Sequence, residues 1–310
     1  GGQHWIETPE VVSSGGSFVI FNNNSVEYFE HNQESGVLQP IFEESLDEGI
    51  VDIAILTDSN GVEHLAILSP NDLQLVDTSD KSTEFVELNT NSSVLASSGA
   101  LVAISEKSEA GPLVNITSID SDLTISIPLD PRSSERIEDS IMNSGTILDF
   151  QNSTIVDLVM DSNWLVATVD VGPFNRTVLV DTLSINQTLI SNPRWDSSYP
   201  SIGDGRVAFL QVTRDDILST AISSQRSNDV YVHELKSGET KQYTFDEEVS
   251  QTQPQILFER LAWIEINDDG EKELQLFSFT DTIEPRNSLL LHASILAMIP
   301  LIFLWTLQSY

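Results

Sequence analysis

Short runs of apolar residues, bounded by Gly, Asn, Asp and Ser, recur along the chain. Residues 19–21, 101–104 and 165–169 are β-branched or otherwise apolar and only a few positions long. Such runs are typical of β-strands. Residues 230–235 begin as a continuous apolar run and end in alternation, as expected when neighbouring sheets cover the inner strands of a repeat. The pattern predicts an all-β protein.

The same strand pattern occurs twice near the C-terminal end. Residues 199–209 and 229–244 form a first copy, and residues 253–263 and 273–279 form a second, with a turn at 267–270. Each copy contains short strands joined by hairpin turns. Repetition at this period indicates a propeller or another repeat array.

Weaker copies precede this pair. Taking six apolar positions as equivalent gives gaps of 47, 36, 64, 42 and 54 residues, which scatter around the length of a four-stranded blade. These positions are Phe18, Leu65, Leu101, Leu165, Val207 and Leu261. The long gap contains a polar segment, 130–144, expected to be an excursion between blades or a short helix.

The sequence therefore predicts a β-propeller of about six four-stranded blades within residues 1–284, either a closed ring or an incomplete one. A pair of β-sandwich domains is the alternative, which would need no internal period. The expected units are 8–45, 48–90, 94–130, 150–192, 197–246 and 252–283.

The first copy carries a resemblance to a known family. Pro200, Ile202, Gly203, Asp204 and Arg206, followed by the strand 229–232, resemble the TolB-like β-propeller repeats of microbial, archaeal-type cell-surface proteins. The second copy matches at Pro254, Ile256, Arg260, Leu261 and Trp263, but has Phe258-Glu259 in place of Gly-Asp. The good matches cover about 85 residues. The resemblance implies a fold and a surface location, and it implies no reaction.

The C-terminal end predicts a membrane anchor over residues 285–310. Residues 288–310 contain no Asp, Glu, Lys or Arg, and the apolar stretch 289–307 would span roughly 28 Å as a helix, close to the thickness of a bilayer core. Trp305 and Tyr310 would lie at the headgroup level. The membrane is thus an expected partner through residues 288–308, and a buried core helix is the alternative.

Charge and chain ends refine the expected location. The chain has 14 basic and 48 acidic residues, a net charge of −34, which argues against binding nucleic acid. Such acidity fits either a salty medium or an acidic exported protein. We expect the bulk of the chain to be extracellular. The first residue is Gly1 and no signal sequence is present, so either one was removed or the sequence is a fragment.

Six N-x-S/T sequons support an exported glycoprotein, although an Asn/Ser/Thr-rich chain yields several by chance. The candidate glycosylation sites are Asn23, Asn91, Asn115, Asn152, Asn175 and Asn186.

No catalytic constellation is evident in the sequence. Cysteine is absent, which excludes disulfides and thiolate metal sites. No nucleophile signature or P-loop is present, and no cofactor is expected. The five histidines occur singly, which favours structural over ligand roles; they are His4, His31, His64, His233 and His292.

Calcium is the one ion considered. Asp58, Asn60, Asn267 and Asp269 place oxygen ligands near a glycine, as calcium loops do. Hairpin turns select the same residues, and we favour turns.

Three aromatic residues, Trp164, Phe209 and Trp263, occupy near-equivalent positions within their units. They could form a binding surface for sugars or peptides, but packing between blades is the favoured interpretation.

The sequence thus leaves three functional hypotheses. The first is a membrane-anchored extracellular propeller that serves as a non-catalytic binding or scaffold module for a protein or glycan at the cell surface. The second is a propeller enzyme, a hydrolase or lyase acting on polysaccharide or peptide, with a discontinuous site at the channel mouth. The third is an accessory subunit that docks another envelope protein.

Overall fold

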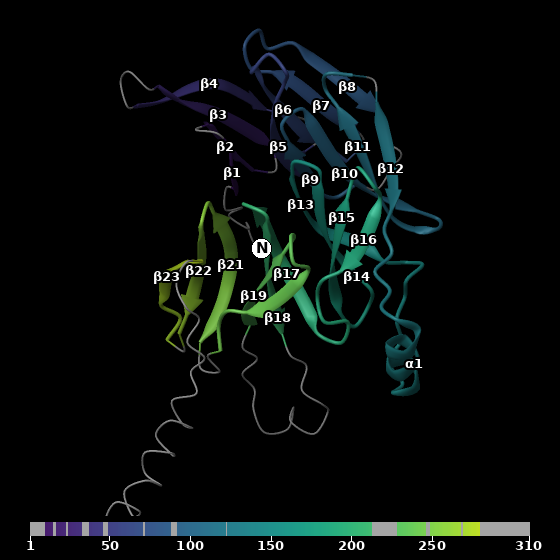
Figure 1. Ribbon diagram of the computed structural model, residues 1–310. Helices are drawn as coiled ribbons and strands as arrows, with labels where there is room; N and C mark the ends of the chain where they lie inside the picture. The colour runs from purple at the N-terminus through teal and green to yellow at the C-terminus, as the bar shows by residue number, and fades with distance from the viewer. Residues whose placement is uncertain are drawn as a thin grey trace, which may run out of the picture.

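The protein is a β-propeller built from six antiparallel sheets that follow one another around an axis (Figure 1). The computed structural model describes residues 10–14, 17–22, 24–32, 37–45, 49–70, 72–87, 92–121, 123–212, 228–245, 249–267 and 269–279. The all-β, six-bladed fold predicted from the repeats is confirmed. A pair of sandwiches is excluded because each sheet packs against the next rather than against a single partner.

Blades 1 to 3 each contain four consecutive strands paired in chain order. Blade 1 comprises β1 (Glu10–Ser14), β2 (Ser17–Phe21), β3 (Ser25–Asn32) and β4 (Val37–Ser45). Blade 2 comprises β5 (Asp52–Thr57), β6 (Glu63–Leu68), β7 (Asp72–Asp77) and β8 (Thr83–Glu87). Blade 3 comprises β9 (Leu95–Ser98), β10 (Leu101–Ser108), β11 (Gly111–Ser118) and β12 (Thr124–Pro128).

Blades 4 and 5 have the same order, and blade 6 has three strands in the described part of the chain. Blade 4 comprises β13 (Thr154–Asp161), β14 (Trp164–Asp170), β15 (Asn175–Asp181) and β16 (Asn186–Leu189). Blade 5 comprises β17 (Asp196–Gly203), β18 (Arg206–Val212), β19 (Asn228–Glu234) and β20 (Glu239–Gln242). Blade 6 comprises β21 (Ser250–Leu257), β22 (Arg260–Ile266) and β23 (Lys272–Ser278).

One backbone hydrogen bond repeats in blades 2 to 6. The residue that follows the third strand donates its N–H to the carbonyl that precedes or begins the second strand, at 2.9 to 3.2 Å. The five pairs are Thr78–Glu63, Ile119–Ala100, Thr182–Asn163, Leu235–Gly205 and Phe279–Glu259. This bond fixes the common register of the blades.

That register corrects two sequence alignments. Five of the six positions taken as equivalent do coincide, but Leu101 lies one residue early, and the buried Val102 takes its place. Trp164 corresponds to Arg206 in blade 5, so it is not equivalent to Phe209. Alternating burial cannot be read from the four-residue apolar run at 101–104, which explains the one-residue shift.

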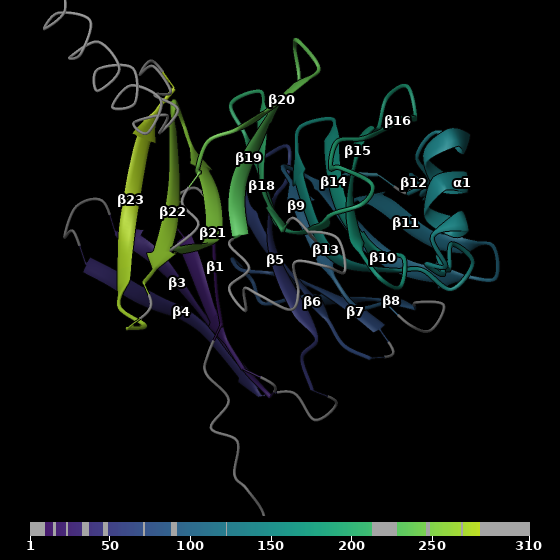
Figure 2. The ribbon, with the colours of Figure 1, turned by 90° about the horizontal axis from the view of Figure 1, so that it is seen from below.

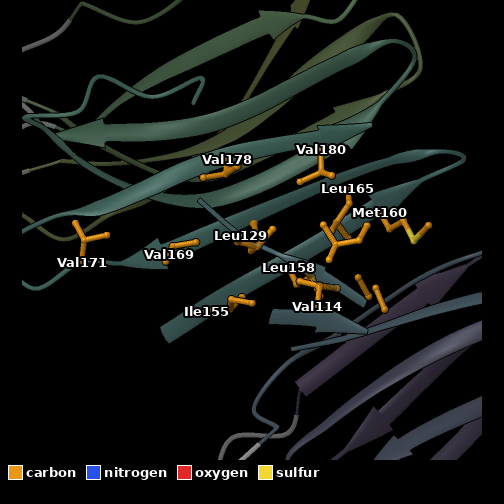
Figure 3. Packing of buried hydrophobic residues seen from close by; sticks show 14 of the residues in the cluster. Val114, Leu129, Ile155, Leu158, Met160, Leu165, Val169, Val171, Val178 and Val180 are labelled. Carbon is orange, nitrogen blue, oxygen red and sulfur yellow. The ribbon is translucent and has the colours of Figure 1, made fainter. Parts of the chain in front are cut away.

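The core is a series of layers between neighbouring blades. Figure 3 shows the layer between blades 3 and 4, where Val114 and Leu129 face Ile155, Leu158 and residues of β14 and β15. Phe209 is fully buried between blades 4 and 5, and Trp263 is buried between blades 5 and 6. The interpretation of these two rings as packing between blades is therefore confirmed.

The polar segment 130–144 contains the short helix α1 (Glu135–Asn143), which lies on the outside beside blades 3 and 4 (Figures 1 and 2). A single buried cation holds this connection. The Arg176 guanidinium donates to the Pro131 carbonyl at 2.9 Å, to the Pro193 carbonyl at 2.8 Å and to Glu138 Oε1 at 2.8 Å. The guanidinium also lies 5.7 Å from the centre of the Phe150 ring.

Candidate functional site

The first strand of each blade lies nearest the axis, and these strands contact one another around it (Figure 1). We call the surface formed by β1, β5, β9, β13, β17 and β21 the axial surface. Residues from every blade can meet there, so it is the place where a discontinuous site would form.

Three successive first strands carry a β-bulge. The register shifts between Ile155 and Asp157 in β13, between Ser198 and Ser201 in β17, and between Thr252 and Gln255 in β21. A bulge adds a residue to one strand and redirects its side chain. The bulges of β17 and β21 lie opposite the equivalent residues Phe209 and Trp263, whereas the bulge of β13 lies between the pairs of Thr168 and Val169, one to two residues farther along.

The bulges of blades 5 and 6 place exposed side chains in strained backbone. Tyr199 and Gln253 both have φ of 50°, in the left-handed region, and each precedes a buried proline. The side chain of Tyr199 is 49% exposed, and Val156 in the bulge of β13 is 44% exposed. Left-handed backbone at bulky residues persists only where the surrounding structure enforces it, and it is often found at functional sites.

Asp157 adjoins the exposed Val156 and is itself half-buried. Burial raises the pKa of its carboxyl to about 6, although the N–H of Leu158 opposes this shift. Thr168 is its cross-strand neighbour on β14, and the buried Thr168 Oγ1 has no hydrogen-bond partner among the described residues. A carboxyl in this setting is protonated more readily than an exposed one, and can donate a proton near neutral pH.

Tyr199 and the proline after Gln253 belong to the repeats seen in the sequence, but the sequence pattern predicts no role for Tyr199, Gln253 or Asp157. In the sequence, the indication for Tyr199 and Gln253 was that each directly precedes the proline in its copy of the repeat. For Asp157 it was an acid among the otherwise apolar residues 155–160. Both signals are weak without knowledge of which strands line the axis.

The calcium candidates lie in turns that use their own oxygens. Asp58 Oδ1 accepts the N–H of Asn60 at 2.9 Å and that of Val62 at 2.7 Å. Asn267 Oδ1 accepts the N–H of Glu271 at 2.8 Å. The described residues contain no group of three or more His, Cys, Asp or Glu side chains arranged to hold a metal. The turn interpretation accounts for these contacts.

Asn267 also borders an acidic groove of about 470 Å³ at one end of blade 6, which Val249, Glu265, Glu271, Lys272 and Glu273 complete. Both oxygens of the Glu265 carboxylate already accept hydrogen bonds, from Trp263 Nε1 at 3.2 Å and from Gln275 Nε2 at 3.0 Å. This carboxylate therefore supports blade 6.

The three histidines within the described residues, His31, His64 and His233, belong to three different blades. His233 Nδ1 lies 2.9 Å from Thr240 Oγ1, and burial lowers the pKa of His233. His64 Nε2 lies 3.7 Å from Asp58 Oδ2. The backbone of His31 belongs to β3, and His4 and His292 lie outside the described residues.

Four sequons fall within the described residues. Asn152 and Asn186 are exposed, whereas Asn115 and Asn175 are half-buried. Asn115 Oδ1 accepts a hydrogen bond from Ser126 Oγ at 2.6 Å, so its amide belongs to the sheet surface. Glycosylation at any of these positions stays a prediction, and the sequons at 23 and 91 lie outside the described residues.

In the described part of the chain, no helix is long and apolar enough to cross a bilayer. The predicted anchor, residues 285–310, lies outside that part.

Comparison with solved structures supports the fold alone. The β-propeller domain of the Trilobed protease from Pyrococcus furiosus, described as having an open velcro topology, matches with a TM-score of 0.54 and 12% identity, covering 90% of this chain and 84% of that one. The tricorn protease matches with a TM-score of 0.51 and 13% identity, and 86% of this chain spans only 24% of its length. A putative TolB from Agrobacterium tumefaciens matches with a TM-score of 0.46 and 12% identity, covering 83% of this chain and 86% of that one.

No family model matches the chain, and no curated protein matches its sequence. The fold therefore defines the class, a six-bladed β-propeller with TolB-like proteins among its structural neighbours. The tricorn and Trilobed protease matches, at 13% and 12% identity, show the fold alone, so they do not decide between a binding module and an enzyme.

Proposed function

We propose that this protein is a membrane-anchored propeller of the cell surface that binds a protein or glycan ligand at its axial surface without chemical turnover. The observation that carries the proposal is the exposed Tyr199 ring, held in strained backbone at a bulge on a strand whose other residues are buried or half-buried. Exposed aromatic rings offer a large, rigid contact area with a polar tip, which suits sugars and peptides. Gln253 and Val156 would extend this surface into the adjacent blades.

Binding is tested with the full chain in lipid nanodiscs on arrays of neutral oligosaccharides and peptides. For any probe retained by the wild type, we expect Tyr199→Ala to weaken binding at least tenfold. Phe85→Ala is the matched control, because Phe85 is also an exposed ring but lies on the outer strand β8. Equal binding by the wild type and Tyr199→Ala would show that Tyr199 does not contribute to the binding site, and this result would contradict the proposal.

Membrane anchoring is tested separately, because it rests on the sequence of residues 288–308. We expect the full chain to stay with membranes after alkaline carbonate extraction and Leu296→Asp to be released, since a charged side chain at the bilayer centre is costly. External protease should degrade the propeller in intact cells. Protection from that protease would reverse the proposed orientation.

Asp157 favours a second candidate, a hydrolase or lyase acting on polysaccharide or peptide. A carboxyl with a pKa of about 6 beside the axial surface has the acidity required of a general acid. On this hypothesis Asp157→Asn abolishes turnover of a bound substrate but leaves its affinity within about twofold. Turnover by Asp157→Asn at the wild-type rate would eliminate Asp157 as the acid.

A further inference from the structure

The turn between β21 and β22 exposes an aromatic ring to solvent. Phe258 lies in this turn with φ of 54° and is 90% exposed, more than any other large apolar side chain in the described part of the chain. Leu257, directly before it, is 49% exposed. By register, Phe258 takes the place of Asp204 in blade 5, a residue type that tight turns favour. A bulky apolar side chain held in the left-handed region at a surface turn indicates a role in binding.

The same turn adjoins the last described residue of the chain. β21 and β23 both run toward this turn, and β22 begins at it (Figure 2). The N–H of Phe279 donates to the Glu259 carbonyl at 3.0 Å. The Arg206 guanidinium lies 4.2 Å from the centre of the Phe279 ring, and the Tyr243 ring lies 5.9 Å from it. These contacts fix residue 279 beside the turn that carries Phe258.

The length of chain after residue 279 limits how far the turn can lie from a membrane. The stretch without acidic or basic residues begins at residue 288, nine residues after Phe279. Nine residues span at most about 30 Å. If the chain enters a bilayer at residue 288, as the proposed function requires, the lipid surface stays within that distance of residue 279. A tether of this length keeps the lipid at a high effective concentration beside Phe258.

Charges of opposite sign balance around the turn, although the net charge of the chain is −34. Arg206 Nη1 lies 2.8 Å from Asp204 Oδ2 in the neighbouring turn of blade 5. Glu259 and Arg260 are adjacent, exposed and of opposite sign. A zwitterionic lipid surface therefore meets no excess of negative charge from these four side chains. Phe and Leu are typical of segments that enter the boundary between headgroups and acyl chains, and Arg can extend from there to the headgroups.

We propose that the β21–β22 turn is a membrane contact, in which Phe258 and Leu257 enter the headgroup region of a zwitterionic bilayer and Arg260 meets lipid phosphates. The proposal rests on the membrane anchor of the proposed function and adds a second point of attachment within the propeller. Two attachments orient the propeller on the membrane, whereas a single tether leaves it free to turn. The end of blade 6 at which β21 begins then faces away from the lipid.

The chain has no native cysteine, so a fluorescent reporter can be attached at one position. The full chain carrying Glu259→Cys, labelled with a nitrobenzoxadiazole group, is reconstituted in phosphatidylcholine nanodiscs that contain a lipid with a nitroxide on its headgroup. Phe245→Cys is the control label site, because Phe245 is exposed and follows β20 at the opposite end of blade 5. The seven residues of β19 separate the two ends of that blade by about 20 Å. We expect the nitroxide to quench the label at position 259 at least threefold more strongly than the label at position 245.

A second measurement tests the ring itself. Phe258→Asp should lower the quenching at position 259 at least twofold, because a charged side chain does not enter the lipid. The fold should tolerate this substitution, since Asp204 occupies the equivalent turn of blade 5. Phe85→Asp is the matched control, because Phe85 is an exposed ring on the outer strand β8, and it should leave the quenching unchanged.

The outcomes separate this contact from the anchor on which it rests. If the full chain does not co-elute with nanodiscs, both the anchor and the contact are wrong. If it co-elutes but the labels at 259 and 245 are quenched equally, or Phe258→Asp has no effect, the anchor stands and the contact is wrong. A label at 259 that is shielded from aqueous iodide but not quenched by the lipid nitroxide would assign the turn to a protein partner or a second copy of the chain, which also contradicts the proposal.

Discussion

At the scale of single residues, burial sets the chemistry of Asp157. Its pKa in the folded protein, about 6, lies above the ordinary value of 3.8, so the folded state holds the proton more tightly than the unfolded state. The resulting stabilisation is complete below about pH 4 and is lost as the pH rises through 6. An asparagine at this position has no charge to bury.

We therefore expect the stability of Asp157→Asn relative to wild type to increase from pH 4 to pH 7, by about 2 to 3 kcal/mol. Urea unfolding of both proteins across this range measures the difference. Glu109→Gln, at an exposed turn, serves as the control and should show no such trend. A difference for Asp157→Asn that stays constant with pH would mean that the carboxyl is ionised in the fold.

Phe258, like Tyr199 and Gln253, has a positive φ that conflicts with its side chain. It occupies the β21–β22 turn with φ of 54°, and its ring is 90% exposed. The corresponding turn of blade 5 has Asp204 and Gly205 at φ of 48° and 71°, residues that tolerate this region.

Phe258→Gly should therefore raise the free energy of unfolding by about 1 kcal/mol, because glycine removes the steric cost of positive φ. Thermal unfolding measures the change. Phe85→Gly is the control, since Phe85 is exposed within a strand and its replacement should be destabilising. A loss of stability in Phe258→Gly would indicate that the Phe258 ring has a packing partner.

At the scale of elements, Arg176 joins α1 to the body of the propeller. Its side chain is fully buried, and Glu138 supplies the neutralising charge from the helix. The Glu138 carboxyl loses hydration on burial, which raises its pKa, but its bonds to Arg176 and Ser133 outweigh this and lower the pKa overall.

Arg176→Met should destabilise the protein by about 3 kcal/mol, because it removes a fully buried guanidinium with all its hydrogen bonds and leaves the half-buried Glu138 carboxylate without its partner. Hydrogen exchange should also become faster in α1 than in β14. Arg132→Met is the control, since the Arg132–Asp130 pair is exposed and pairs of that kind contribute about 0 to 1 kcal/mol. Equal effects of the two substitutions would contradict a structural role for the buried pair.

At the scale of the whole molecule, the net charge of −34 opposes compaction. Salt screens repulsion between exposed charges, with a Debye length of about 10 Å at 0.1 M and about 3 Å at 1 M. The Tm should therefore rise by several degrees between 0.1 and 1 M NaCl. Choline chloride should give the same rise if screening is the cause, and a Tm independent of both salts would contradict it.

The sequence by itself determined the local features of the fold. Strand type, the number of repeats and the turn from Asp58 to Gly61 depend on contacts within a few residues, and the β-propeller follows from repeating them. The excursion at 130–144 was also visible, because its polar composition differs from that of the strands around it. The sequence could not decide whether Leu101 or Val102 is the residue equivalent to Val207 in blade 5. Because both faces of this strand are buried, the strand lacks the alternation of apolar and polar residues that would set its register.

The tertiary structure decided everything that depends on one blade meeting another. The burial of Phe209 and Trp263 and the raised pKa of Asp157 arise from packing between sheets. The exposure of Tyr199 accompanies the bulge in β17. Leu276 and Val232 show the reason most plainly, because they share a register position and differ only in whether a following blade covers them. A residue's own sequence neighbours specify its strand, but the surface that meets that strand comes from far along the chain.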